Sequence, residues 1–133
     1  MNLLLDTHVW IWSQEAPEEC GPLALERLAD PANTLYVATV STLEIARLVD
    51  GGGLILRGSL QAWVRRSTDL LRCRTVELSH AIAMTAYELP GTFHKDPADR
   101  ILVAAAKRLS LTLVTADERI LAYSHVRSLN ARK

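Results

Sequence analysis

Short, unbroken runs of apolar residues alternate along the chain with longer segments in which apolar residues recur every three or four positions. The short runs have the length of buried strands, and the longer segments have the spacing of amphipathic helices. We therefore predict strands over Asn2–Leu5, Thr34–Thr39, Arg74–Leu78, Leu111–Val114 and Val126–Leu129. Helices are predicted from Thr7 onward, over Pro22–Ala29, Ser41–Val49, Ser59–Leu71 and Ser79–Leu89, from Asp96 to Leu109, and over Asp117–Tyr123.

This order of elements predicts the fold class. Strands that alternate with helices along a whole chain form a mostly parallel sheet with helices on both faces. The expected architecture is an α/β fold, a three-layer αβα sandwich. With 133 residues the chain has the size of one domain, so we expect residues 1–133 to share a single fold.

Composition adds limits on location and partners. The chain is 49% hydrophobic and 23% charged, which is typical of a folded globular protein. The first apolar run contains Asp6 and His8 and lacks a basic start, so we expect neither a signal peptide nor a membrane span. Cys20 and Cys73 lack the spacing of a zinc or redox site, which favours reduced thiols and a cytoplasmic location. The net charge is zero, so any nucleic-acid contact must come from a local basic patch.

Acidic residues follow the predicted strands at the points where helices begin. Asp6, Glu44 and Asp117 each come after an apolar strand and lie at or near the start of a helix. In a parallel sheet these turns meet at one edge, where ligand sites form, and Asp99 can join them from the first turn of its own helix. Crowded carboxylates repel one another unless a cation neutralises them. All-oxygen ligands favour Mg²⁺ or Mn²⁺ over zinc.

Each acidic residue also has a simpler interpretation as a helix cap. Ser41-Thr42-Leu43-Glu44 has the form of a capping box, and Asp96, Asp6 and Asp117 stand where N-caps are preferred. Under this alternative the chain is a non-catalytic interaction module.

Polar neighbours of the acidic residues are weaker candidates. Thr7 and Thr115 could orient water or bond to the backbone of their turns. For His8 and His94 we expect packing or surface roles, because a metal can activate water without a histidine base. Arg100 has two alternatives of equal weight, contact with phosphate and pairing with a site carboxylate.

Four segments carry a resemblance to a known family. LLLDTHVW around Asp6, VSTLEIA around Glu44, HKDPADRILVAAA around Asp99 and LVTADERI around Asp117 resemble the acidic motifs of the PIN domain. More narrowly, they resemble the toxin ribonucleases of bacterial VapBC toxin–antitoxin modules. The resemblance spans nearly the whole chain. Asp99 matches the family's motif better than Asp96, because it directly precedes the Arg-Ile-Leu-Val-Ala-Ala stretch.

The resemblance implies a set of functional expectations. They are a PIN-like fold, endoribonuclease activity dependent on Mg²⁺ or Mn²⁺, a homodimer, and inhibition by a small antitoxin protein. Asp6, Glu44 and Asp99 match the three central acidic positions of the family, and Asp117 matches the more variable fourth.

The aromatic residues Trp10, Trp12 and Tyr36 are expected to pack in the interior. Trp63 lies beside Arg65 and Arg66 and is predicted to be the exception, exposed as part of an antitoxin groove or a dimer surface.

Two further kinds of protein, a phosphatase and a phosphorylatable receiver, share a doubly wound sheet with acidic residues at one edge. A phosphatase of this kind needs a second Asp two positions after the first, where this chain has His8. A phosphorylatable receiver needs a Lys after a later strand, and no predicted strand ends in that way. Both are therefore weaker hypotheses.

Overall fold

A five-stranded parallel sheet forms the centre of the protein. The computed structural model describes residues 1–133 and orders the strands β3-β2-β1-β4-β5. Every neighbouring pair in the sheet is parallel. The strands are β1 (Asn2–Leu5), β2 (Thr34–Ala38), β3 (Arg74–Val76), β4 (Thr112–Thr115) and β5 (Ser128–Asn130). The predicted α/β class with a parallel sheet is confirmed.

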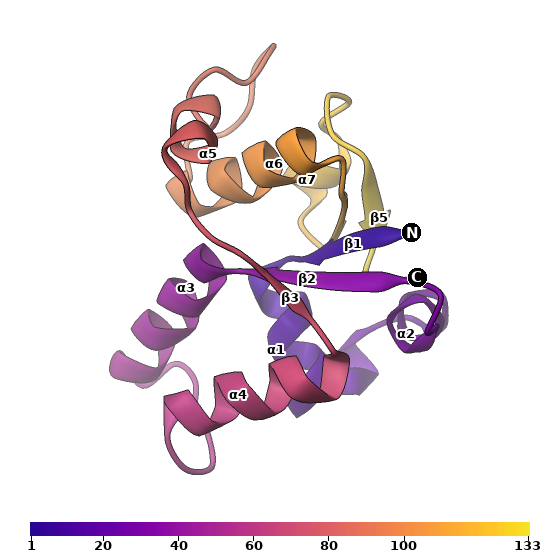
Figure 1. Cartoon of the computed structure of the whole chain (residues 1–133), viewed down its shortest axis with the longest axis vertical. Coiled ribbons are helices and arrows are strands. Elements are labelled where there is room, and N and C mark those ends of the chain that lie inside the picture. Colours follow the sequence, from indigo (N-terminus) through magenta and orange to yellow (C-terminus); the bar gives the residue numbers. More distant parts are fainter.

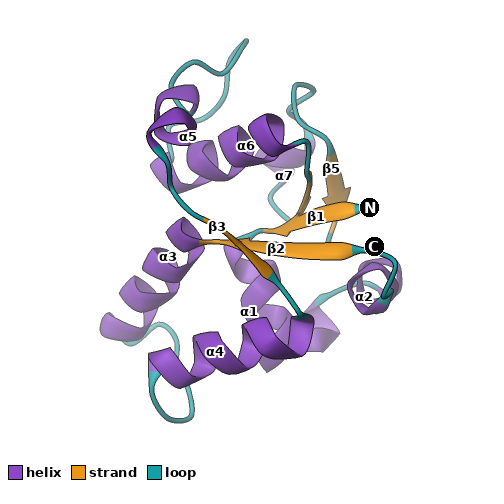
Figure 2. Cartoon of the chain, viewed as in Figure 1, coloured by secondary structure: helices purple, strands orange, loops and turns teal.

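Helices cover both faces of the sheet, which gives the expected three layers (Figures 1 and 2). The helices are α1 (Thr7–Glu15), η1 (Pro17–Glu19), α2 (Pro22–Ala29), α3 (Thr39–Asp50), α4 (Leu60–Leu71), α5 (His80–Thr85), α6 (Pro97–Leu109) and α7 (Glu118–Leu121). Helices α1 and α4 lie on one side of the sheet in Figure 1, and α5 and α6 lie on the other. None of these helices combines the length and the apolar character that crossing a bilayer requires.

The central strand β1 separates two hydrophobic cores. Leu4 packs into the core beneath α5 and α6, whereas Leu3 and Leu5 point into the core beneath α1 and α4. All three side chains are fully buried. Because successive side chains of a strand point to opposite faces, a strand with helices on both sides needs an unbroken apolar run. The first residues of the sequence therefore fix β1 at the centre of the sheet.

Several element boundaries differ from the predicted ones. Thr39 begins α3 instead of ending β2, and α7 has four residues where a helix to Tyr123 was predicted. The last strand is Ser128–Asn130, because its register places Asn130 beside Thr115 at the end of β4. These shifts lie at the ends of short elements, where local propensity is weakest.

The prediction that Trp63 is exposed is wrong. Its side chain is 2% exposed and lies against Trp10, with ring centroids 5.3 Å apart. Ser67 lies one helical turn after Trp63, and its Oγ accepts a hydrogen bond from Trp10 Nε1 at 3.0 Å. Arg65 and Arg66 are exposed, because the face of α4 that carries Trp63 and Ser67 is turned toward the sheet. The four-residue spacing of Trp63 and Ser67 was the signal that the neighbouring charges obscured.

We expect the Trp63→Ala protein to lose about 3–5 kcal/mol of unfolding free energy, because truncation leaves a cavity against Trp10. The control is Leu70→Ala in the same helix, whose side chain is 68% exposed and whose loss should change stability by less than about 0.5 kcal/mol. Urea unfolding measures both values. Equal effects of the two substitutions would contradict the buried position of Trp63.

Candidate active site

Acidic side chains gather in one hollow at the carboxyl edge of the sheet. The hollow has a volume of about 340 Å³, and its walls include all four sequence-predicted residues, Asp6, Glu44, Asp99 and Asp117. Asp96, His8, Trp12, Ala116, Arg119 and Arg132 complete the lining. The structure thus brings together side chains from the ends of β1 and β4 and from helices α3 and α6.

The Asp6 carboxylate is fixed by hydrogen bonds on both oxygens. Its Oδ1 accepts from the Thr7 backbone N–H at 2.7 Å, and its Oδ2 accepts from Thr115 Oγ1 at 2.6 Å. The Thr115 hydroxyl also accepts from the Asp117 backbone N–H at 3.0 Å. Thr115 therefore joins the ends of the adjacent strands β1 and β4 and orients a carboxylate, in addition to bonding to the backbone of its turn.

Glu44 does not form the predicted capping box. Helix α3 begins at Thr39, with Ala38 at the N-cap position and no side-chain cap, so Glu44 lies in the second turn and faces the hollow. Thr7 Oγ1 donates to Glu44 Oε1 at 2.5 Å and lies 2.8 Å from Ser41 Oγ. The prediction failed because the helix starts two residues earlier than the boundary on which the capping box depended.

Asp99 is the most strongly perturbed group of the cluster. Burial, together with the negative charges of Asp6, Asp96, Asp117 and Glu44, raises its pKa to about 7. Burial also raises the pKa of Asp6, in spite of its hydrogen bonds from Thr115 and Thr7. The site therefore carries negative charge that the chain itself does not fully neutralise, which is the electrostatic setting of a cation site.

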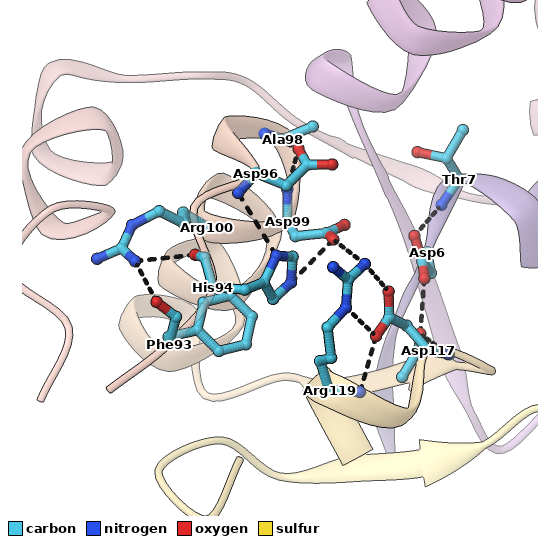
Figure 3. A network of polar contacts seen from close by, with 11 residues as sticks. Asp6, Thr7, Phe93, His94, Asp96, Ala98, Asp99, Arg100, Asp117 and Arg119 are labelled. Carbon is cyan, nitrogen blue, oxygen red and sulfur yellow. Dashed lines mark hydrogen bonds and ion pairs between the residues drawn. The ribbon is translucent and has the colours of Figure 1, made fainter. Parts of the chain in front are cut away.

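Asp117 is paired with Arg119, a residue that no sequence pattern had marked as functional. Asp117 caps α7 by accepting from the Arg119 backbone N–H at 2.8 Å. The Arg119 Nη2 lies 3.0 Å from Asp117 Oδ2 and 3.9 Å from Asp99 Oδ2 (Figure 3). Burial acts to raise the pKa of Asp117, but the hydrogen bonds from Arg119 lower it below its usual range.

His94 also lies at the cluster, although a packing or surface role was expected. Its Nε2 atom is 3.1 Å from Asp99 Oδ2, and its side chain is only 15% exposed. Potential ligand atoms of His94, Asp99 and Asp117 all lie within 4.8 Å of one another. The signal in the sequence was its place five residues before Asp99, close enough for the loop to fold back on the helix start.

Arg100 pairs with no site carboxylate, so that alternative is wrong, and its contact with phosphate stays a prediction. Its guanidinium points away from the hollow and donates to the carbonyl oxygens of Ala86, Phe93 and His94, at 2.8, 3.1 and 3.0 Å. Arg100 precedes an apolar helical stripe, and the helix turns it toward the loop before α6 instead of toward the carboxylates.

Asp96 acts as the expected helix cap. Its Oδ1 accepts from the backbone N–H groups of Ala98 and Asp99, at 2.9 and 3.5 Å. The residue is exposed at the wall of the hollow, where its charge adds to that of the cluster.

With this geometry established, comparison with known proteins identifies the family. A sequence model of the PIN domain matches residues 3–126. The chain belongs to the PIN domain family. This PIN domain is 33% identical over 126 residues to "Ribonuclease VapC22" of Mycobacterium tuberculosis, covering 95% of each chain.

Solved structures show the same fold at lower sequence identity. VapBC2 from Rickettsia felis, bound to a DNA fragment from its promoter, contains a chain that superposes with a TM-score of 0.69 at 17% identity, covering 98% of both chains. VapBC-1 from nontypeable Haemophilus influenzae gives 0.66 at 15% identity, covering 100% of both. These matches confirm the PIN-like architecture.

The raised pKa of Asp99 predicts how stability depends on pH in the absence of metal. A carboxyl with a raised pKa in the folded state stabilises the fold below about pH 4, and that contribution is lost as the pH rises through about 7. We therefore expect the wild-type protein to lose on the order of 3 kcal/mol of unfolding free energy over this interval relative to Asp99→Asn. Urea unfolding with chelator at several pH values measures the difference.

Exposed Asp69 provides the control for this measurement. The Asp69→Asn protein should follow the wild-type pH profile. A wild-type profile parallel to that of Asp99→Asn would contradict the assigned pKa.

Proposed function

We propose that this PIN domain, a single domain over residues 1–133, is a metal-dependent endoribonuclease whose site is formed by Asp6, Glu44, Asp99 and Asp117. The observation that carries the proposal is the gathering of these carboxylates around one hollow, with raised pKa values at Asp6 and Asp99. RNA is favoured as the substrate because the chain is 33% identical to a protein named as a ribonuclease. The fold alone would not identify a substrate.

The residues at the hollow fit a divalent cation. The four proposed ligands offer only carboxylate oxygens, which suit Mg²⁺ and Mn²⁺. The pKa of about 7 at Asp99 reflects clustered negative charge, and a cation would relieve it. When bound, such a cation supplies stabilisation of the charge that develops on the attacking water and on the phosphodiester.

The chain's own side chains orient the carboxylates and contact the substrate. Thr115 and Thr7 hold Asp6 and Glu44 by hydrogen bonds of 2.6 and 2.5 Å, so these carboxylates need little rearrangement on binding. At the rim, the Arg119 side chain is 62% exposed and can turn from Asp117 toward an RNA phosphate. Such a turn would leave the Asp117 carboxylate free for the cation.

The capping interpretation explains only part of the cluster. Asp6, Asp96 and Asp117 do accept hydrogen bonds from helix N-termini. Glu44 caps no helix, and Asp99 is buried in the first turn of α6 behind a cap that Asp96 already provides. Two buried or half-buried carboxylates without a structural task favour a functional site over a non-catalytic interaction module. The family assignment leaves the phosphatase and receiver hypotheses without support.

The biological role that fits best is that of the toxin in a type II toxin–antitoxin pair, with a cytoplasmic location, a cognate antitoxin protein and a homodimeric state. The similarity to VapBC assemblies supports this role. Exposed apolar side chains on α3, on the loop after it and on α5 offer surface for protein partners: Leu43, Ile55 and Met84.

Loss of the central carboxylates tests the enzymatic proposal. Asp6→Asn and Asp99→Asn should each lower RNA cleavage by about 10³-fold or more, since each substitution removes several kcal/mol of charge stabilisation. The assay uses purified protein, Mn²⁺ and a pool of fluorescently labelled single-stranded RNA. Asp69→Asn is the matched control and should keep the wild-type rate. EDTA should abolish cleavage by the wild-type and the Asp69→Asn proteins.

Equal cleavage by the wild-type and Asp6→Asn proteins would identify a contaminating nuclease and refute the proposal. Absence of Mn²⁺ binding in a calorimetric titration of the wild-type protein would favour the non-catalytic module instead.

A further inference from the structure

A partly buried imidazole lies against Asp99 and has no task in the function proposed so far. The His94 Nε2 atom is buried and has no aligned hydrogen-bond partner, although it lies 3.1 Å from Asp99 Oδ2. Buried polar atoms are rarely left without a partner. At this distance, a small rotation of the Asp99 carboxylate completes a hydrogen bond from the imidazole.

The hydrogen bond at Nδ1 of His94 defines which of the two ring nitrogens carries the proton. His94 Nδ1 accepts from the Asp96 backbone N–H at 3.4 Å. In the neutral ring this contact assigns the proton to Nε2. His94 is therefore a donor on the side that faces Asp99.

The ring lies behind Asp99, outside the hollow. His94 is absent from the walls of the hollow, whereas Asp6, Asp99 and Asp117 are part of them. In Figure 3 the Asp99 carboxylate lies between the His94 ring and Asp6. His94 can therefore hold Asp99 from the side away from Asp6, at the border of the hollow, where its ligand atom lies within 4.8 Å of those of Asp99 and Asp117.

A clamp on the loop before α6 fixes the position of the ring. Arg100 donates to the carbonyl oxygens of both Phe93 and His94, and its guanidinium carbon lies 5.0 Å from the centre of the Tyr87 ring. The Phe93 ring packs on the His94 ring with centroids 4.4 Å apart. Because Arg100 directly follows Asp99 in α6, the clamp ties the imidazole to the helix that carries the carboxylate.

We propose that His94 is a positioning residue, whose Nε2–H holds Oδ2 of Asp99 and leaves the other carboxylate oxygen to the cation. The proposal rests on the proposed metal-dependent function. Groups that hydrogen-bond to metal-binding carboxylates commonly set their orientation, and their loss lowers metal affinity by about 10–100-fold.

Calorimetric titration of the full chain with Mn²⁺ tests this role without relying on RNA cleavage. His94→Phe keeps an aromatic ring against Phe93 but removes the donor, and we expect it to weaken Mn²⁺ binding by about 10–100-fold. His94→Gln offers a side-chain N–H at similar reach and should recover most of the affinity. His80→Ala removes an exposed imidazole at the start of α5 and should bind like the wild type. Thermal unfolding of each metal-free protein verifies that it is folded.

Three results would overturn the proposal, each in a different way. Wild-type affinity in a folded His94→Phe protein would show that the ring only packs. A directly bound nitrogen in the pulsed EPR spectrum of the Mn²⁺ complex, lost in His94→Gln, would make His94 a ligand instead of a positioning residue. Absence of Mn²⁺ binding by the wild type would refute the proposed function together with this inference, whereas the first two results leave the proposed function intact.

Discussion

The carboxylates of Asp6 and Asp99 are both withdrawn from solvent at the same edge of the sheet. Arg119 pairs closely with Asp117 and lies 3.9 Å from Asp99, but it forms no ion pair with Asp6. Burial and mutual repulsion together make ionisation of Asp99 unfavourable. The polar contacts around the hollow hold Asp6 and Glu44 in place without an ion pair to either, whereas Asp117 is paired with Arg119.

The hydrophobic cores of the fold stabilise the folded state and so offset the repulsion between the clustered carboxylates. Fully buried Leu3, Leu4 and Leu5 anchor the central strand between two cores. They place Asp6 at the point where β1 meets α1. Thr115 ties the neighbouring strand end to the same carboxylate. A rigid double core thus allows a destabilising group of acids to persist at its edge, which is a common relation between stability and function.

Sequence patterns predicted the individual strands and the sheet edge at which the acidic residues gather. The apolar runs indicated the strands, and the acidic residues after them indicated a shared edge, because a parallel sheet brings such turns together whatever the exact boundaries. These inferences survived errors of one or two residues in where α3, α7 and β5 begin or end.

Features that depend on how side chains turn within an element were predicted less well. The face of α4 that carries Trp63 was misjudged because its charged neighbours dominate the local pattern. The orientation of Arg100 depends on carbonyl groups in a loop with no regular pattern of its own. The approach of His94 to Asp99 depends on that same loop. Tertiary contacts of this kind leave almost no periodic signal in a sequence.

If the carboxylates of this PIN domain form a divalent-metal site, anomalous X-ray diffraction from crystals of the protein soaked in Mn²⁺ will locate the ion. We expect an anomalous peak in the hollow, with oxygens of Asp6 and Asp99 as ligands at about 2.0–2.3 Å, the range for hard cations of this size. Diffraction that shows no Mn²⁺ at these carboxylates, with Arg119 still paired to Asp117, would contradict the proposed metal site.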